Sequence, residues 1–468
     1  MADIINQTVS LINDKFLGYI LMSALMAAGI YFSFATRLVQ FISPKKMLNV
    51  MKTGIKSGEG KGHISSFQAF SISTASRVGT GNIAGIAIAI TVGGPGAIFW
   101  MWLIAVISAA SAFVESTLAQ VYKVKQGKHF RGGPAYYMQT ALGKRWLGCI
   151  FAVIITLTFA FVFNSVQSNT IAQSLYKSFN ISPLASGIII AALTAIIIFG
   201  GLKRIASFSA VIVPFFALSY IAITLIVMIL NIDKMPDVLA LIFKDAFSLR
   251  NIAGGTLGAT IMTGARRGLF SNEAGMGSAP NAAATANIAH PVTQGYVQAL
   301  SVFVDTLIIC SCTAFIVLLS DYANLNLEGI ALTQAALSQT MGSFGEYFIS
   351  ASVLLFAFTS IIGNYYYGQA NIEFLTDKKW IMPLFRILVT AMVLLGAVAQ
   401  LHLVWNMADL FMTIMALMNI SVLFLLRKQA LDVLADYRRQ RKAGVQEPIF
   451  DPANVPSVQK AYAWQKHQ

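Results

Sequence analysis

Charged residues are scarce in this sequence: they make up 11% of 468 residues, against roughly 25% in a typical soluble domain. This deficit excludes a protein whose surface faces mainly water. Cysteine is also rare, and Cys149, Cys310 and Cys312 all fall in apolar stretches, which argues against a disulfide framework or a cysteine zinc site. The five histidines are scattered without ligand spacing, and no nucleophile–base constellation is present. The pattern is therefore not that of an enzyme.

Long hydrophobic runs dominate the chain instead, with 56% hydrophobic residues and a mean hydropathy of +0.68. A bilayer core requires about 20 apolar residues per helix, and backbone groups in lipid must be paired within the helix. The predicted fold class is an all-α polytopic membrane protein with about 11 transmembrane helices. We expect these spans at about 16–36, 67–91, 95–121, 146–173, 184–200, 205–230, 251–277, 293–319, 346–374, 380–400 and 404–426.

The net charge of +14 is unevenly distributed between the connections. Alternate connections and the C-terminal tail hold 24 lysines and arginines, whereas the connections on the other side hold five. The positive-inside rule therefore places the N-terminus outside and the C-terminus in the cytoplasm. The positive charge is thus explained by orientation in the membrane rather than by nucleic-acid binding. Residues 44–62 are basic and amphipathic and predict a helix on the membrane surface. The tail at 431–468 predicts a short helix followed by a disordered end.

The second predicted span is interrupted by small and polar residues. Its middle reads STASRVGTGN over positions 73–82, a composition that a continuous lipid-facing helix does not need. We therefore expect a helix broken at the membrane midplane. The half-helix that restarts near Thr80 would direct its amides at an anion, for which a carboxylate is the natural candidate. Carbonyls released near Ala75 and Val78 would suit Na⁺.

The seventh span has the same character. It contains TGARRGLFSNEAGMGSAP over residues 263–280, and its break falls either at Thr263–Gly268, which we favour, or at Phe270–Gly275. Two such segments occupy corresponding positions in spans 2–6 and spans 7–11, the arrangement that best indicates a transporter binding site. The candidate substrate-binding residues of the seventh span are Thr263, Gly264 and Asn272.

Further polar side chains lie in other spans. Thr359 and Ser360 in the ninth span could contribute hydroxyl oxygens to a cation cage, or could bond back to their own helix. Asn164 and Gln167 in the fourth span could face the site. The sequence assigns no role to Arg77, Arg266 and Arg267, and no ion-pair partners to the carboxylates Glu115, Glu273, Asp305, Glu373 and Asp409.

These motifs permit an assignment to a family. The stretches FQAFSISTASRVGTGNIAGIAIAITVGGPGAIFWMW, GARRGLFSNEAGMGSAPNAAATA and GNYYYGQANIEF resemble the alanine or glycine:cation symporter family, and the resemblance extends over residues 10–430. It implies a LeuT-type fold with two inverted five-helix repeats, at 67–230 and 251–426. An extra helix at 16–36 precedes them within a single transporter domain, 1–430. It also implies Na⁺-driven uptake of alanine or glycine across a bacterial or archaeal cytoplasmic membrane.

The wider resemblance to sodium-coupled LeuT-type transporters implies roles for individual residues. The amides of Thr80 and Gly81 would hold the substrate carboxylate, and Asn82 would lie near the substrate or a second ion. The carbonyls of Ala75, Val78 and Phe356 would form the sodium site together with the hydroxyls of Thr359 and Ser360. Na⁺ is the co-transported ion, and no organic cofactor, protein partner or nucleic acid is expected.

Three other functions remain to be compared with this prediction. A proton-coupled transporter would titrate Asp305 or Glu273, a channel would need a filter segment, and a membrane-embedded enzyme would need a polar catalytic cluster near one membrane face. The sequence does not distinguish alanine from glycine or another small amino acid.

Overall fold

The computed structural model describes residues 9, 13, 17–41, 64–126, 129–248, 257–458 and 460–464. The fold is helical, apart from a small antiparallel hairpin in which β1 (Val124–Gln126) pairs with β2 (His129–Arg131). The helices are α2 (Gly18–Ala35), α4 (Ser66–Arg77), α5 (Ile86–Gly93), α6 (Gly96–Val121), α7 (Pro134–Thr140), α8 (Arg145–Ile155), α9 (Asn164–Phe179), α10 (Pro183–Ile198), α11 (Leu202–Leu230), α12 (Met235–Ala246), α14 (Leu257–Asn272), α15 (Ala279–Ala283), α16 (Val292–Phe303), α17 (Ser311–Leu318), α18 (Gly329–Met341), α19 (Ser343–Leu375), α20 (Ile381–Val398), α21 (Leu401–Leu425) and α22 (Arg427–Lys442).

The polytopic membrane fold is confirmed. Within the described ranges, eight continuous helices are long and apolar enough to cross a membrane, and nine if the bent pair formed by α4 and Gly81–Gly93 is one span. Two of the eight are composite: α8 and α9 are joined by the π-helix Thr156–Phe163 into Arg145–Phe179, and α16 and α17 by the π-helix Val304–Cys310 into Val292–Leu318. The predicted spans at 184–200 and 251–277 correspond to α10 and α14, each 16 residues long. The total of eleven therefore stays a prediction.

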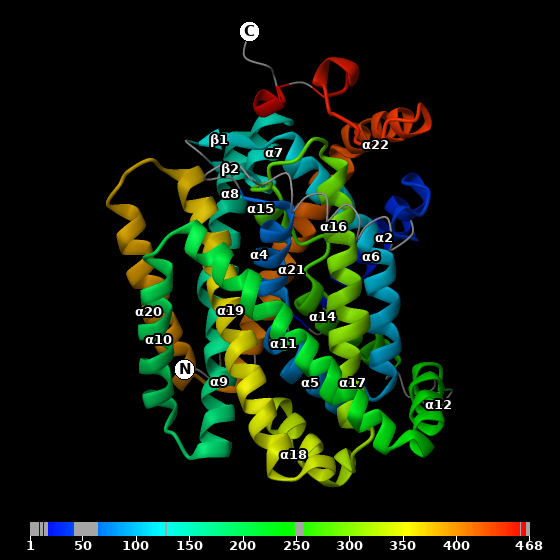
Figure 1. Ribbon diagram of the computed structural model, residues 1–468, viewed down its shortest axis with the longest axis vertical. Coiled ribbons are helices and arrows are strands. Elements are labelled where there is room, and N and C mark those ends of the chain that lie inside the picture. The colour runs from blue at the N-terminus through cyan, green and yellow to red at the C-terminus, as the bar shows by residue number, and fades with distance from the viewer. Residues whose placement is uncertain are drawn as a thin grey trace.

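The helices form a bundle with the broken helix near its centre. In Figure 1, α4, α14 and α21 lie in the middle, α10 and α20 on one side, and α2 and α6 on the other. Helix α6 packs against α2, α14 and α16, while α19 packs against α4, α9 and α18. Each half of the chain thus supplies helices to the region around α4.

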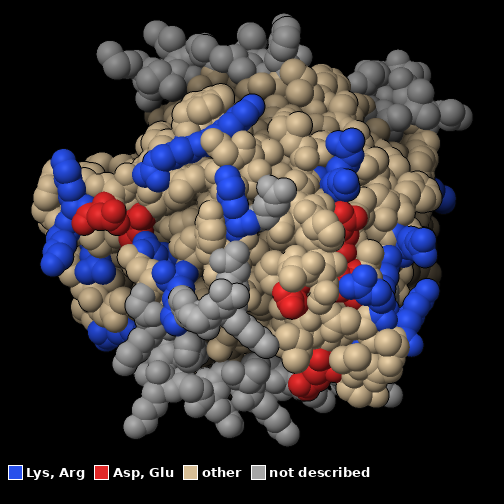
Figure 2. Space-filling model, turned by 90° about the horizontal axis from the view of Figure 1, so that it is seen from above, with Lys and Arg blue, Asp and Glu red and all other residues tan. Residues whose placement is uncertain are grey.

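One end of the bundle is rich in lysine and arginine. The hairpin β1–β2, α7 and α22 gather at this end, which we call the basic end, and α12 and α18 lie at the opposite end (Figure 1). Figure 2 looks onto the basic end and shows lysine and arginine spread over it, with fewer acidic side chains. The basic connections predicted for one side of the membrane, 122–146 and 378–379, and the tail are therefore brought together.

The C-terminal tail corrects one prediction. Its helix α22 is present, but the segment after it, predicted to be disordered, packs onto the bundle, with Phe450, Val455, Val458 and Ala461 buried. The predicted surface helix at 44–62 lies outside the described residues.

Candidate functional site

The second span is broken as the sequence predicts. Helix α4 ends at Arg77, Val78 is extended with φ −77° and ψ 91°, and the chain restarts as a π-helical segment, Gly81–Gly85, that continues into α5. The two halves are bent by 50°. This region is rich in serine, threonine and glycine, which stabilise a helix less than most other residues do. The break therefore leaves backbone carbonyls and amides in the buried centre of the bundle for side chains from elsewhere to bond.

The hydroxyl of Ser360 on α19 lies at the carbonyl end of this break. Its Oγ is 2.8 Å from the Ala75 carbonyl oxygen, 3.2 Å from that of Val78 and 3.0 Å from that of Phe356. A hydroxyl has one hydrogen and cannot donate to three acceptors at once. Four of the five residues predicted to hold sodium are thus brought together as convergent, uncharged oxygens.

Thr359, the fifth predicted sodium residue, has a different local partner. Its Oγ1 donates to the carbonyl oxygen of Phe356 in its own helix, at 2.9 Å. This is the local bonding that the sequence leaves open as an alternative. Because the Phe356 carbonyl also faces Ser360, Thr359 borders the cluster and shares one of its oxygens.

The amides at the start of the new half-helix are held by side chains. The Thr80 amide donates to Oε1 of Gln167 at 3.0 Å, and the Gly79 amide donates to Oδ1 of Asn82 at 2.9 Å. Gln167, on α9, therefore lies at the break. A substrate carboxylate that binds the Thr80 amide must take the place of the glutamine oxygen.

Aromatic rings close over Gly81. A Cβ on Gly81 would lie 2.8 Å from the Phe270 ring, so glycine alone allows this approach. Phe270 contacts two further rings, Phe163 with centroids 4.5 Å apart and Trp405 with centroids 4.8 Å apart. The candidate substrate position is thus bordered by a column of three rings from three helices, which the sequence analysis did not identify.

A buried ion pair lies beside these rings. The Arg267 guanidinium binds the carboxylate of Asp409 on α21 and lies 4.8 Å from the Trp405 ring centroid. Both side chains of the pair are less than one-tenth exposed. A second pair, Arg131 with Glu373, lies near the basic end at 2.6 Å. Two arginine–carboxylate pairings that the sequence left unassigned are thereby defined.

Asp305 forms a second polar cluster beside the break. Its carboxylate accepts from the Asn82 amide nitrogen at 2.7 Å, from the Ser271 hydroxyl at 2.6 Å and from the Thr306 hydroxyl at 3.1 Å. All four side chains are buried. The carboxylate therefore joins the break of α4 to the end of α14.

The break in the seventh span follows Asn272, and our preference for Thr263–Gly268 is wrong. Helix α14 runs unbroken to Asn272, and Glu273, Gly275 and Gly277 then take φ values of 56°, 82° and 86°. The helix ends where Glu273 enters the left-handed region, and Gly275 and Gly277, for which that region carries no steric cost, continue the irregular segment.

The three predicted substrate residues of this span therefore separate. A Cβ on Gly264 would lie 2.3 Å from the Ala97 carbonyl oxygen, and Thr263 packs against Gly93, so both belong to the contact of α14 with the α5–α6 corner. Asn272 lies at the break, where it donates to the Thr306 hydroxyl at 3.1 Å.

Two buried glutamates hold the second break in place. Glu115 on α6 accepts from the Gly275 amide at 3.1 Å and the Gly277 amide at 3.0 Å. Glu273 accepts from the hydroxyls of Ser76 at 2.7 Å and Ser278 at 2.6 Å. The Ser76 contact connects the two broken segments directly.

Arg77 lies among these carboxylates. It is 1% exposed, and its three guanidinium nitrogens have no hydrogen-bond partner within the described part of the chain. Its charge is attracted by Glu115, Glu273 and Asp305. The buried centre therefore holds one arginine against three carboxylates.

A helical membrane protein with a break of this kind at a buried oxygen cluster is typical of a transporter. The chain belongs to the sodium:alanine symporter family, which matches residues 2–452. It is a transporter, not an enzyme, and the resemblance inferred from the motifs is confirmed.

The names of two relatives mention different amino acids. The chain is 53% identical to a probable sodium/glutamine symporter, GlnT, of Bacillus subtilis, over 96% of this chain and 94% of the relative. It is 44% identical to a putative sodium/proton-dependent alanine carrier protein, YrbD, of the same organism, over 94% of each chain. Among solved structures, a Na⁺-coupled sialic acid symporter shares 12% identity with a TM-score of 0.45, over 92% of this chain and 86% of the other.

Proposed function

We propose that this protein is a secondary symporter that couples uptake of a small neutral amino acid, alanine or glycine, to Na⁺ entry by alternating access. The observation that carries the proposal is the approach of Ser360 Oγ to the carbonyl oxygens of Ala75, Val78 and Phe356. Uncharged hard oxygens from a broken helix suit a monovalent cation. The family supports sodium as the ion.

Substrate binding is assigned to the other side of the same break. The carboxylate would accept from the Thr80 and Gly81 amides, helped by the positive end of the half-helix. Asn82, Gln167 and Asn272 would border the amino acid. The Phe270 ring against Gly81 favours a small side chain. Glutamine, which the name of one relative carries, would need the aromatic column to move.

Coupling follows from the shared helix. Na⁺ between α4 and α19 would fix the break and thereby preform the amides for the carboxylate, so each ligand raises the affinity for the other. Such coupling is typically about 1–3 kcal/mol and is reciprocal. The membrane potential adds about 2.3 kcal/mol per charge per 100 mV.

The proposed architecture is the LeuT-like pair of inverted repeats, spans 2–6 and 7–11, with one extra N-terminal helix. Two breaks, at Val78–Thr80 and after Asn272, support this pairing. The basic end would face the cytoplasm, with the N-terminus outside, in a bacterial or archaeal inner membrane.

Proton coupling is the second candidate, because Asp305 is a buried carboxylate that hydrogen-bonds both broken segments. Uptake of radiolabelled alanine into proteoliposomes separates the two. Accumulation driven by an inward Na⁺ gradient at fixed pH supports the sodium symporter. Accumulation driven only by a proton gradient would indicate that the buried carboxylates, rather than a sodium site, couple transport to the ion gradient. No uptake under either gradient, with folded protein, would contradict the substrate assignment.

A further inference from the structure

The C-terminal segment after α22 is attached to the basic end at two separate points. At the first, the Phe450 amide donates to the Ala289 carbonyl oxygen at 2.9 Å, and the Phe450 ring lies 5.4 Å from the His290 ring. At the second, the Trp464 indole donates to the Gln120 carbonyl oxygen at 2.9 Å. The segment therefore bridges α6 and the connection between α15 and α16.

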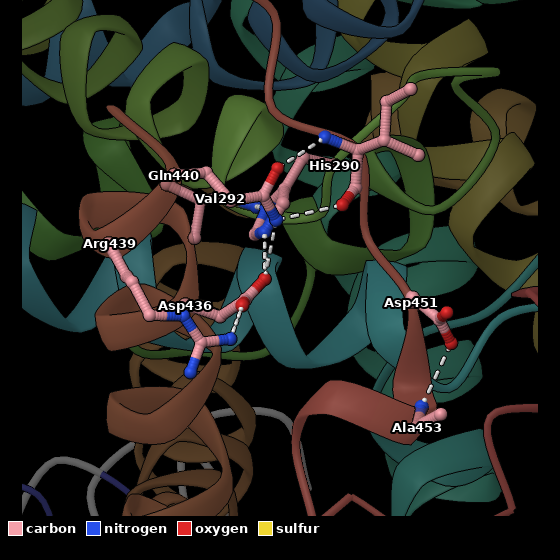
Figure 3. Close-up of polar contacts among 8 residues, drawn as sticks. His290, Val292, Asp436, Arg439, Gln440, Asp451 and Ala453 are labelled. Atoms are coloured by element: carbon pink, nitrogen blue, oxygen red, sulfur yellow. Dashed lines mark hydrogen bonds and ion pairs between the residues drawn. The ribbon is translucent and has the colours of Figure 1, made fainter. Parts of the chain in front are cut away.

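Helix α22 reinforces the first attachment. His290 Nε2 lies 3.3 Å from Oδ2 of Asp436, both side chains are 1% exposed, and the Tyr437 ring lies 5.0 Å from the imidazole. Figure 3 shows His290 pointing toward Asp436, which Arg439 and Gln440 also contact. Gln440 in turn bonds Ile449 through both its side-chain atoms, so helix and segment hold one another.

Lys123 forms the second attachment. Its Nζ lies 4.1 Å from the Phe130 ring centroid and 4.5 Å from that of Trp464, so the last described turn of the chain closes over the end of the lysine side chain. Lys123 is 2% exposed and donates to the Ala286 carbonyl oxygen at 3.0 Å. Docking of Trp464 therefore packs an apolar ring against a lysine nitrogen that is already removed from water.

Both attachments converge on residues 283–290, and this stretch is paired with the start of the broken helix. The Asn287 amide donates to the Ile64 carbonyl oxygen at 3.1 Å, and Ser65 directly after it caps α4. Gln120 adds a bond to the Ala286 carbonyl oxygen at 3.1 Å. Movement of α4 at the basic end thus requires movement of a stretch that the C-terminal segment holds.

We propose that residues 427–464 are a detachable clasp that restrains the opening of the basic end, its docking surface being formed by Gln120, Lys123 and residues 283–290. The clasp rests on the proposed transport function, since alternating access requires α4 to move relative to its surroundings. Release of the clasp accelerates the step that opens the basic end, and locking it slows that step.

Point variants of the full chain test the release. Trp464→Ala removes the ring over Lys123 and the bond to Gln120, and Asp436→Asn removes the charge opposite His290. Tyr462→Ala is the matched control, because Tyr462 lies in the same short turn and is 59% exposed. Hydrogen exchange of residues 444–464 reports release independently of transport. We expect faster exchange and an initial uptake rate raised about twofold or more in the double variant, with both unchanged in the control.

A reversible lock tests the opposite direction. In Ala289→Cys/Phe450→Cys, oxidation joins two residues whose backbones are hydrogen-bonded, and reductant separates them. We expect slower uptake in the oxidised protein and recovery on reduction. Equal uptake by locked, released and unmodified protein, with exchange confirming each state, overturns the clasp. Absence of uptake by the unmodified protein under any gradient instead contradicts the proposed function.

Discussion

Ser360 and Ala75 are 285 positions apart in the chain, yet the Ser360 hydroxyl lies 2.8 Å from the Ala75 carbonyl oxygen. This contact joins α19 to the end of α4 where the latter breaks, so an ion bound here would hold the two helices together. Thr359, its neighbour, bonds its own helix instead. Substitution of each hydroxyl in turn therefore compares a predicted ion ligand, Ser360, with a neighbour that bonds its own helix, Thr359.

Ser360→Ala should weaken sodium binding more than Thr359→Ala does. Loss of one buried ligand costs about 1–3 kcal/mol, so the sodium concentration for half-maximal uptake should rise roughly 5- to 150-fold in Ser360→Ala. Uptake measured against sodium concentration at fixed alanine checks this. Equally small effects of both substitutions would show that the Ser360 hydroxyl does not bind the cation.

Gly81→Ala should abolish uptake while the protein still inserts, because its Cβ would lie 2.8 Å from the Phe270 ring. If that contact is the cause, Gly81→Ala/Phe270→Ala should recover part of the uptake and accept larger side chains. The measurement is competition by alanine, glycine, serine and glutamine. A double variant as inactive as the single one would show that the ring is not responsible.

Carboxylate recognition by the half-helix amides predicts a simple substrate rule. Alaninamide, which lacks the free carboxylate, should compete for alanine uptake at least about a hundredfold more weakly, since a charge-assisted contact to backbone amides is lost. Inhibition curves with alanine, alaninamide and glycine check this. Equal competition by alanine and alaninamide would exclude the amides of Thr80 and Gly81 as the carboxylate site.

Asp409→Asn should destabilise the protein by about 3–5 kcal/mol, since it leaves the Arg267 charge buried without its partner. Arg267→Met/Asp409→Leu removes both charges and should recover most of this loss. Thermal midpoints of the purified proteins in one detergent provide the comparison. A double variant less stable than Asp409→Asn would show that the pair stabilises the fold beyond neutralising each charge.

Docking of the C-terminal segment should weaken on acidification. Burial lowers the pKa of Lys123 to about 7, whereas an exposed lysine titrates near 10.4. Between these values the released form is protonated and the docked form is not, so docking loses free energy as the pH falls from about 10 to about 7. Burial also lowers the pKa of His290, although the hydrogen bond to Asp436 partly offsets this effect. Protonation of His290 below about pH 6.5 therefore weakens docking as well.

Hydrogen exchange of residues 444–464, corrected for the intrinsic pH dependence, measures this docking. It should be faster at pH 6.5 than at pH 8.5, and Lys123→Met should remove most of the difference. The groups that face Lys123 are Gln120, the Ala286 carbonyl, Phe130 and Trp464. Those that face His290 are Asp436, Tyr437 and Phe450. Slower exchange at the lower pH would contradict the prediction that acidification weakens docking.

The break of the second span was predictable because local composition alone disfavours a helix there. Serine, threonine and two glycines between residues 73 and 82 weaken the helix wherever the rest of the chain goes. The seventh span misled the same reasoning, because Gly264 and Gly268 also read as weak points. In the structure the former packs close to the Ala97 carbonyl oxygen and the latter close to Met101, so tight helix packing explains those glycines.

The sequence by itself determined the membrane class, the family, the asymmetry of charge and the position of the first break, because these follow from composition and local propensity. Only the tertiary structure decided which distant groups meet: Ser360 with the carbonyls of α4, Phe270 over Gly81, Asp409 with Arg267, and Trp464 over Lys123. Such contacts depend on how helices rotate and cross one another, and that is set by packing over the whole bundle. No short stretch of sequence carries that information.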